Sequence, residues 1–202
     1  MVKIHIIGAP GSGKTTLAQE LVSRLHIPHY DLDKINLEEE GPVTLAARPA
    51  WVTEGIYLIT TEPMLYHADH IVLLEISWPV AAWRVIRRHI SNSLHGRQQY
   101  PGLNGIKLLF KLVYDMRRYL LNLDEAGVSS AASLQAYREA HRNISAPPTV
   151  EFMQMYIEAY GDLIAPPSER FVRAYLAAYK DKVFVVRNGA DRERLLELLT
   201  RK

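Results

Sequence analysis

Short apolar runs and amphipathic stretches alternate along this chain of 202 residues, and the alternation predicts strands followed by helices. The runs are rich in β-branched and aromatic residues, which strands favour. Four clear runs lie at residues 4–7, 49–58, 70–77 and 182–189, with a shorter segment at 26–33. The chain is therefore expected to be of the α/β class.

Apolar residues at helical spacing follow several of these runs. Leu17, Leu21 and Leu25 are spaced as one helical stripe, and residues 62–69 are expected to form a short helix. Pro79 opens a longer helix, because proline suits a first helical turn. These intervals are expected to supply the helices that cover the strands.

The second half of the chain is expected to be mainly helical. Residues 91–105 contain Gly, Asn and Gln and are expected to form a loop. From 106 to 123 apolar residues recur at i, i+3, i+4 and i+7, which predicts an amphipathic helix. Residues 124–145 are expected to form a loop and a helix, and Asp191 is expected to cap the closing helix.

Two tandem segments of similar sequence lie late in the chain. Residues 146–162, APPTVEFMQMYIEAYGD, align without gaps on residues 165–181, APPSERFVRAYLAAYKD. Each copy joins two prolines to a Thr or Ser that can cap a helix, then places Phe and Tyr at matching points. Two helices of one design are the structural interpretation, and a binding role for the tyrosines is the alternative. Residues 106–181 are thus expected to be a helical elaboration within one domain that spans 1–202.

Composition narrows the class of protein. A hydrophobic content of 48% and a charged content of 23% are typical of a globular domain that buries a core. The chain has no cysteine, no pattern of a signal peptide and no run long enough to span a membrane, and together these features favour a cytoplasmic protein. The formal charge of +2 does not by itself indicate a nucleic-acid partner.

The stretch IHIIGAPGSGKTT, residues 4–16, contains the most specific motif. It satisfies G-x-x-x-x-G-K-[ST] between an expected strand and an expected helix. Glycines allow successive N–H groups to turn inward around an anion, and the helix N-terminus adds its positive end. In this motif the lysine reaches the β- and γ-phosphates, and the threonine hydroxyl ligates Mg²⁺. The predicted nucleotide-binding residues are Gly8, Ala9, Pro10, Gly11, Ser12, Gly13, Lys14, Thr15 and Thr16.

The segment HIPHYDLD ends in two aspartates, Asp31 and Asp33. If the strand persists, the alternation places both carboxylates on one side, at an end that faces the ligand crevice of a parallel α/β sheet. One of them could accept the proton of a hydroxyl or hold Mg²⁺ through water. The alternative is that Asp33 caps a helix over 34–40 while Asp31 lies in solvent.

The run PAWVTEGIYL reaches its end at Glu54 and Gly55. A carboxylate beside a phosphate loop can hold the waters of Mg²⁺, and a glycine lets the backbone approach a substrate closely. Tyr57 is a candidate for the acceptor pocket. The alternatives are a solvated glutamate at a strand terminus and a tyrosine that only packs.

Arginines crowd one side of the helix that Pro79 opens. Arg84 lies three residues before Arg87 and four before Arg88, and like charges at these spacings repel by about 0.2–0.5 kcal/mol per pair. Phosphate oxygens between the guanidinium groups would offset this repulsion. We therefore expect Arg84 and Arg88 to contact nucleotide and residues 89–105 to form a mobile lid loop. The alternative is a solvated basic face with Trp83 in the core.

The last strand ends before Arg187, Asn188 and Gly189. Residues at the carboxyl end of a parallel strand face the ligand crevice, so Arg187 is a candidate to flank the nucleotide base. An ordinary turn between strand and helix is the alternative.

Taken together, these segments resemble the adenylate-kinase-type P-loop kinases, most closely the FlaR-related DNA topology modulation proteins. The resemblance covers roughly the first 90 residues and the last 20. It implies a doubly wound parallel sheet of about five strands with helices on both faces, and transfer of the ATP γ-phosphoryl with Mg²⁺. Arg84 and Arg88 match the two arginines that begin the lid of this family, the first near adenine and the second on phosphates.

The resemblance also points to a departure at the acceptor site. Glu54 and Gly55 occupy the place of an Asp-Gly pair of the family. Nucleoside-monophosphate kinases usually have an arginine shortly after this pair, which holds the acceptor phosphate, but here residues 56–58 are Ile-Tyr-Leu. Asp31 and Asp33 are instead similar to the Asp-x-Asp of shikimate-type kinases, which phosphorylate a hydroxyl.

The sequence is therefore interpreted as a Mg·ATP-dependent kinase of a small acceptor, with a hydroxyl favoured. Lys14 and Arg88 would stabilise the transferring phosphoryl, Asp33 would orient or deprotonate the acceptor, and Thr15 and Glu54 would hold Mg²⁺. Two alternatives stay open: a nucleoside-monophosphate kinase, and a nucleotide-binding regulator or adaptor with slow hydrolysis. The expected partners are a nucleotide and a small molecule, not a membrane or nucleic acid.

Overall fold

A computed structural model describes residues 1–33, 41–58, 60–96, 102–123 and 166–200. Five strands form one sheet in the order β2-β3-β1-β4-β5, and every neighbouring pair is parallel. The strands are β1 (Lys3–Gly8), β2 (His29–Asp31), β3 (Trp51–Gly55), β4 (His70–Leu74) and β5 (Val183–Val186). The expected five-stranded parallel sheet is confirmed.

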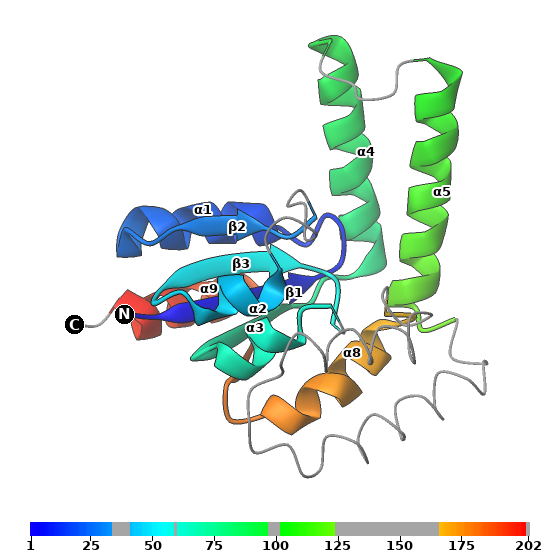
Figure 1. Cartoon of the computed structure of the whole chain (residues 1–202). Coiled ribbons are helices and arrows are strands. Elements are labelled where there is room, and N and C mark those ends of the chain that lie inside the picture. Colours follow the sequence, from blue (N-terminus) through cyan, green and yellow to red (C-terminus); the bar gives the residue numbers. More distant parts are fainter. Residues whose placement is uncertain (34–40, 59, 97–101, 124–165, 201–202) are drawn as a thin grey trace.

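Helices cover both faces of this sheet, as expected of a doubly wound fold (Figure 1). Helices α1 (Lys14–Leu25) and α9 (Gly189–Thr200) pack on one face. Helices α2 (Pro42–Ala47), α3 (Glu62–His67) and α8 (Glu169–Leu176) lie on the other, and a 3₁₀ turn, Ala177–Tyr179, follows α8. Helices α4 (Trp78–Leu94) and α5 (Leu103–Leu120) lie side by side and rise away from the sheet (Figure 1).

The two faces follow from the alternation of side chains along the strands. In β1, Ile4 and Ile6 point to the core beneath α1, where they meet Leu21, while Ile7 points to the opposite core and meets Leu65. All five side chains are fully buried. Each contributes about 1.5–3 kcal/mol relative to an exposed side chain, so the central strand is fixed from both sides.

The loop conformation expected over 91–105, and over 89–105 as part of a lid, is wrong for the residues that the structure describes, while the mobility of this segment stays a prediction. Helix α4 continues to Leu94, and α5 already begins at Leu103. The serines and asparagine at 91–93 are weak helix formers, but adding a residue to an existing helix costs far less than starting one. The backbone leaves the helical region at Gly96 and Gly102, which have φ of 63° and 73°. Residues 97–101 lie outside the described part.

The amphipathic helix expected over 106–123 is confirmed as α5, with a shift at both ends. Its C-terminal half buries Met116 and Leu120 in the core, as the pattern predicts. Ile106 and Phe110 belong to the same predicted stripe but are exposed, Phe110 to 71%. The reason is positional, because the N-terminal half of α5 rises beyond the sheet beside α4 (Figure 1).

The second tandem copy forms a capped helix, as expected. The Ser168 Oγ accepts a hydrogen bond from the Phe171 backbone N–H at 3.0 Å at the start of α8. Tyr175 and Tyr179 donate hydroxyl hydrogen bonds to Glu62, a buried carboxylate of α3, so these tyrosines fasten α8 and the 3₁₀ turn after it to α3. The first copy and residues 124–145 lie outside the described residues.

The cap of the closing helix differs from the expectation. Helix α9 begins at Gly189, and the Asn188 Oδ1 accepts the Asp191 N–H at 3.0 Å. Asp191 in turn accepts the Arg187 N–H at 2.9 Å through its Oδ2. Asn188 is therefore the capping acceptor, while the Asp191 carboxylate ties the preceding Arg187 backbone to the first turn of α9.

Among the described residues, no helix combines the length and the apolar character needed to cross a bilayer.

A buried histidine lies in the middle of the sheet. His5 of β1 is 0% exposed, and its Nδ1 shares a hydrogen bond of 2.7 Å with the Thr53 Oγ1 of β3. Burial lowers the pKa of His5 to about 3, because the charged imidazolium would lose its hydration. His5 is therefore neutral in the folded protein at physiological pH.

We expect this histidine to make stability depend on pH. Unfolded His5 titrates near pH 6.5 and folded His5 near 3, so between these values the unfolded state binds the extra proton. The free energy of unfolding should fall by about 1.4 kcal/mol per pH unit as the pH drops below 6.5, or about 2 kcal/mol by pH 5. In His5→Asn an amide replaces the Nδ1 without titrating, so urea unfolding should show a shallower slope from pH 6.5 to 5. Equal slopes in the two proteins would contradict a neutral buried His5.

Candidate active site

A cleft of about 790 Å³ opens at the edge of the sheet where the parallel strands end. The loop after β1, the ends of β2 to β5 and the first turns of α4 and α9 line it. It brings together these residues predicted from the sequence: Pro10, Gly11, Ser12, Gly13, Lys14, Thr15, Thr16, Asp31, Asp33, Glu54, Arg84, Arg88 and Arg187. Gly8, Ala9, Gly55 and Tyr57 are not among the described residues that line it.

The loop after β1 needs its glycines at three positions. A Cβ on Gly8 would lie 2.7 Å from the Ser12 Oγ and 2.9 Å from the Leu74 carbonyl oxygen. Gly11 and Gly13 have φ of 78° and 100°, in the left-handed region that residues with a Cβ seldom adopt. The loop can therefore bring its backbone N–H groups to the N-terminus of α1, where an anion is favoured.

Lys14, the first residue of α1, lies across this loop. Its Nζ donates hydrogen bonds to the Gly8 carbonyl at 2.8 Å and the Ala9 carbonyl at 3.3 Å. Burial lowers the pKa of Lys14, and the negative charges of Asp33, Glu54 and Asp31 partly counter that shift. The ammonium is thus held at the mouth of the loop with carboxylates around it.

Glu54 at the end of β3 is buried, with 2% of its surface exposed. Its Oε2 accepts a hydrogen bond from the Thr15 hydroxyl at 3.0 Å, and its Oε1 accepts one from the His29 Nε2 at 3.0 Å. The alternative of a solvated glutamate is therefore wrong.

Gly55 and Tyr57, the other candidates after β3, do not line the described cleft. Gly55 lies beside Leu32, and Tyr57 is half-buried, with its carbonyl accepting a hydrogen bond from the Thr61 hydroxyl at 2.7 Å. Contact of either residue with an acceptor stays a prediction.

Asp31 and Asp33 line the cleft on the β2 side. The strand does not persist to Asp33 as expected, because β2 ends at Asp31. The Asp33 N–H donates to the Asp31 Oδ1 at 3.1 Å, and this side-chain bond turns the backbone out of the strand. Both carboxylates still border the cleft. The alternative that Asp33 caps a helix over 34–40 concerns residues outside the described part.

The arginines of α4 differ in what they contact. The Arg84 Nη1 donates to the Gly11 and Ser12 carbonyls at 3.3 Å each, so Arg84 supports the phosphate loop. Arg88 lines the cleft and has no ion-pair partner within the described ranges. Trp83 is 63% exposed, so the alternative that places it in the core is wrong. Arg87 is exposed and lies outside the cleft lining.

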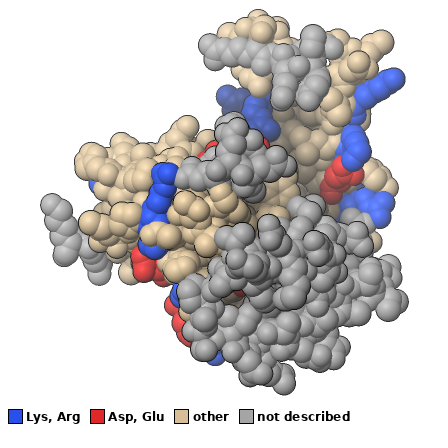
Figure 2. All heavy atoms as spheres, viewed as in Figure 1, with Lys and Arg blue, Asp and Glu red and all other residues tan. Residues whose placement is uncertain are grey.

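Basic residues extend along both helices of the α4–α5 pair, where Lys and Arg side chains are visible (Figure 2). On α4 and α5 these are Arg84, Arg87, Arg88, Lys107, Lys111, Arg117 and Arg118, beside the single acid Asp115. Two of the arginines border the cleft, so the positive charge continues from the phosphate loop up α4.

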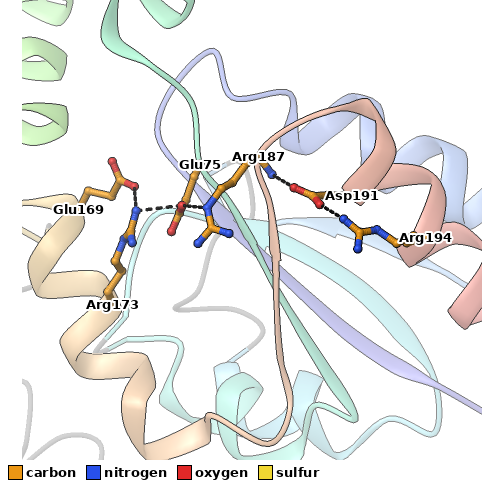
Figure 3. Close-up of polar contacts among 6 residues, drawn as sticks. All are labelled: Glu75, Glu169, Arg173, Arg187, Asp191 and Arg194. Atoms are coloured by element: carbon orange, nitrogen blue, oxygen red, sulfur yellow. Dashed lines mark hydrogen bonds and ion pairs between the residues drawn. The ribbon is translucent and has the colours of Figure 1, made fainter.

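Glu75, just after β4, joins two distant elements at the opposite side of the cleft (Figure 3). Its side chain is 7% exposed, and its Oε2 accepts from the Arg187 Nε at 2.9 Å and pairs with the Arg173 Nη2 of α8 at 2.8 Å. Arg187 thus enters the cleft lining with its guanidinium held by Glu75.

Three cleft or neighbouring residues escaped the sequence analysis. Glu75 and Arg192 line the cleft, and His29 contacts Glu54 from β2. The period-two spacing of His29 and Asp31 was a usable indication for His29, because it places both on one side of a strand. Glu75 follows an apolar run directly, a position that the rule for strand ends also covers.

The described residues fit a nucleotide and Mg²⁺. Gly11 and Gly13, whose positive φ angles turn the loop, line the cleft together with Ser12 at the N-terminus of α1, as a phosphate site requires. Thr15 and Glu54 offer hard oxygen atoms, which Mg²⁺ prefers. Within the described ranges, no group of three or more His, Asp or Glu residues could hold a metal alone. Mg²⁺ ordinarily uses one or two protein carboxylates together with substrate phosphates, so this donor set suits it.

Comparison with known proteins gives limited sequence similarity to shikimate kinases. No family model matches the chain. A shikimate kinase of Syntrophus aciditrophicus is 29% identical over 123 residues, which is 50% of this chain and 63% of that protein. A shikimate kinase of Enterococcus faecalis is 46% identical over 41 residues, 20% of this chain and 24% of that protein. The chain thus spans less than two thirds of each curated relative.

Solved structures are similar at a low level. The structure of shikimate kinase from Acinetobacter baumannii in complex with shikimate is 16% identical, with a TM-score of 0.40 over 98% of this chain and 93% of that one. That of deoxyadenosine kinase from M. mycoides with bound dATP is 14% identical, with a TM-score of 0.32 over 98% and 100%.

We predict that Gly8→Ala weakens nucleotide binding without unfolding the protein. The added Cβ would press on the Ser12 Oγ and the Leu74 carbonyl, and overpacking of this kind costs about 1–3 kcal/mol. If the loop shifts to relieve it, ATP affinity should fall about 5- to 150-fold in calorimetry. Gly41→Ala is the matched control, because a Cβ there meets nothing within 4 Å. Equal affinities in both variants would show that the loop geometry is not required.

Proposed function

We propose that the chain is a Mg·ATP-dependent phosphotransferase that moves the γ-phosphoryl group to a hydroxyl of a small acceptor. The observation that carries the proposal is the shared cleft: the phosphate loop with Lys14 and the carboxylates Asp31 and Asp33 border the same space. The similarity of half of the chain to one protein named shikimate kinase, at 29% identity, supports it.

The donor half of the proposal rests on the loop and on α4. Loop N–H groups and Lys14 would hold the β- and γ-phosphates, and Arg88 faces the cleft with a cationic fork that suits phosphate oxygens. Thr15 and, through water, Glu54 would hold Mg²⁺, which would neutralise charge on the phosphates. Arg84 supports the loop, and Arg187 would flank the base. Catalysis by this arrangement is positioning and charge neutralisation.

The acceptor half rests on carboxylates. A hydroxyl keeps its proton near neutral pH and benefits from a nearby base, whereas a phosphate acceptor needs cationic groups. Asp31 and Asp33 border the cleft, and so does Ile56. Residues 56–58, Ile-Tyr-Leu, contain no arginine, although the resemblance places the acceptor arginine of nucleoside-monophosphate kinases shortly after Gly55. We assign Asp33 as the group that orients or deprotonates the acceptor.

The other expectations from the sequence stay predictions. A cytoplasmic location rests on composition, and the organisation of residues 1–202 as one domain rests on the sequence pattern. The resemblance to DNA topology modulation proteins suggests a different function as the alternative, that of a nucleotide-binding regulator with slow hydrolysis. Salt-dependent DNA binding with slow ATP hydrolysis would support that regulator over the kinase.

Removal of the loop lysine should stop the reaction. Lys14→Ala deletes the ammonium group that would neutralise the β- and γ-phosphates, so we expect turnover to fall by about 10²–10³-fold or below detection. The circular dichroism spectrum should not change, because the lost contacts are two hydrogen bonds within the loop. Lys107→Ala, on the exposed face of α5, is the matched control and should retain full turnover. A folded Lys14→Ala protein with wild-type activity would refute the assignment.

A screen of acceptors tests the hydroxyl assignment. We expect ATP consumption to be stimulated by hydroxyl-bearing metabolites or nucleosides more than by nucleoside monophosphates. Asp33→Asn should lower turnover of such an acceptor by about 10²-fold or more, with ATP affinity little changed, because the amide cannot take a proton. Robust turnover of AMP, CMP, UMP or dTMP, undiminished in Asp33→Asn, would instead establish a nucleoside-monophosphate kinase.

A further inference from the structure

His29 lies close to the phosphate loop although it belongs to no part of the motif. It is the first residue of β2 and shares one side of that strand with Asp31, two residues later. In the parallel pairing of β2 with β3, Asp31 lies opposite Glu54, so His29 lies diagonally across from Glu54 on the same side of the sheet. That side carries α1, to which Thr15 belongs.

The carboxylate of Glu54 is held at both of its oxygens. His29 donates to the Oε1 and Thr15 donates to the Oε2, each at 3.0 Å. A carboxylate with 2% exposure has little water to satisfy it, so these two bonds fix the plane of the group. The Thr15 hydroxyl has only one hydrogen, and giving it to Glu54 leaves the oxygen lone pairs free for a cation.

We propose that His29 is a positioning residue for the Mg²⁺ of the bound nucleotide. His29 holds Glu54, and Glu54 orients the Thr15 hydroxyl, so a bond from β2 sets the geometry of a ligand on α1. The inference rests on the proposed function, since it concerns the metal of the same nucleotide. Partners behind a metal ligand commonly affect metal affinity about 10- to 100-fold, which is the range expected for His29.

The competing explanation is that the bond only fastens β2 to β3. A purely structural bond would change the stability of every His29 variant but would not change how strongly Mg²⁺ enhances nucleotide binding. A positioning role changes that enhancement and leaves the metal-free affinity for ADP the same. The two explanations are therefore separated by a ratio of affinities rather than by activity.

Two amide replacements of different length provide the test. The amide nitrogen of Gln reaches the place of the imidazole Nε2, whereas that of Asn reaches only the place of the Nδ1. We expect His29→Gln to keep the wild-type ratio of ADP affinities with and without Mg²⁺, measured by calorimetry on the full chain. His29→Asn should lower this ratio about 10-fold or more at unchanged metal-free affinity. The electron paramagnetic resonance spectrum of Mn²⁺·ADP, used as a probe, should broaden in His29→Asn alone.

Each result has a defined meaning. Equal ratios in wild type, His29→Gln and His29→Asn would overturn the positioning role and leave the proposed kinase intact. A wild-type protein whose ADP binding does not respond to Mg²⁺ would overturn both the inference and the proposed function. Glu54→Gln provides a second check, because His29→Asn should add no further loss in that background. An additional loss of similar size there would show that His29 does not act through Glu54, and would overturn the inference.

Discussion

All five strands run in the same direction, and this single constraint places the chemistry of the molecule. In a parallel sheet every carboxyl end emerges at one edge, so residues far apart in sequence become neighbours without any special contact between them. The phosphate loop, Asp31, Glu54, Glu75 and Arg187 each follow or end a strand, and all of them border one cleft. The sheet can keep this arrangement because both of its faces are covered by apolar side chains.

The order of the strands divides that cleft into two halves. Strand β1 is central and delivers the phosphate loop, with β3 and β2 on one side and β4 and β5 on the other. Carboxylates assigned to the acceptor and the metal come from β2 and β3, and Arg187 comes from the end of β5. A phosphoryl group held at the loop would therefore lie between its donor and its acceptor, as in-line transfer requires.

Local patterns were sufficient for most of the fold. Runs of Ile, Val and Leu identified the strands, because a parallel strand is buried on both faces and reads as a continuous apolar run. Helix ends were harder to predict, because the polar residues at 91–93 do not stop α4, which ends only just before Gly96 with its positive φ. The exposed half of α5 could not be read from its periodicity, since Phe110 has a core-like spacing but lies where the sheet does not reach.

For the candidate site, the sequence was informative where a motif fixes the spacing and uninformative where a role depends on a neighbouring strand. Lys14 and Thr15 belong to a contiguous motif, so their places follow from it. His29 acquires its contact from the register between β2 and β3, and Glu75 from a helix about 100 residues later in the chain. Gly55 was assigned from a strand end alone, and its contact with an acceptor stays a prediction.

The ion pairs of Glu75 have a further consequence for how the chain tolerates change. One carboxylate pairs with both Arg187, at the cleft, and Arg173 of α8 (Figure 3). The Tyr175 hydroxyl of α8 donates to Glu62 and so fastens this helix to α3. Arg173 and Arg187 share the same oxygen of Glu75, so a substitution in α8 that moves Arg173 would change how strongly Glu75 holds Arg187. This would happen although no residue of α8 lines the described cleft. Selection on nucleotide handling would therefore also act on a surface helix remote from the phosphates, and Arg173 and Glu75 would be expected to change together among descendants of this sequence.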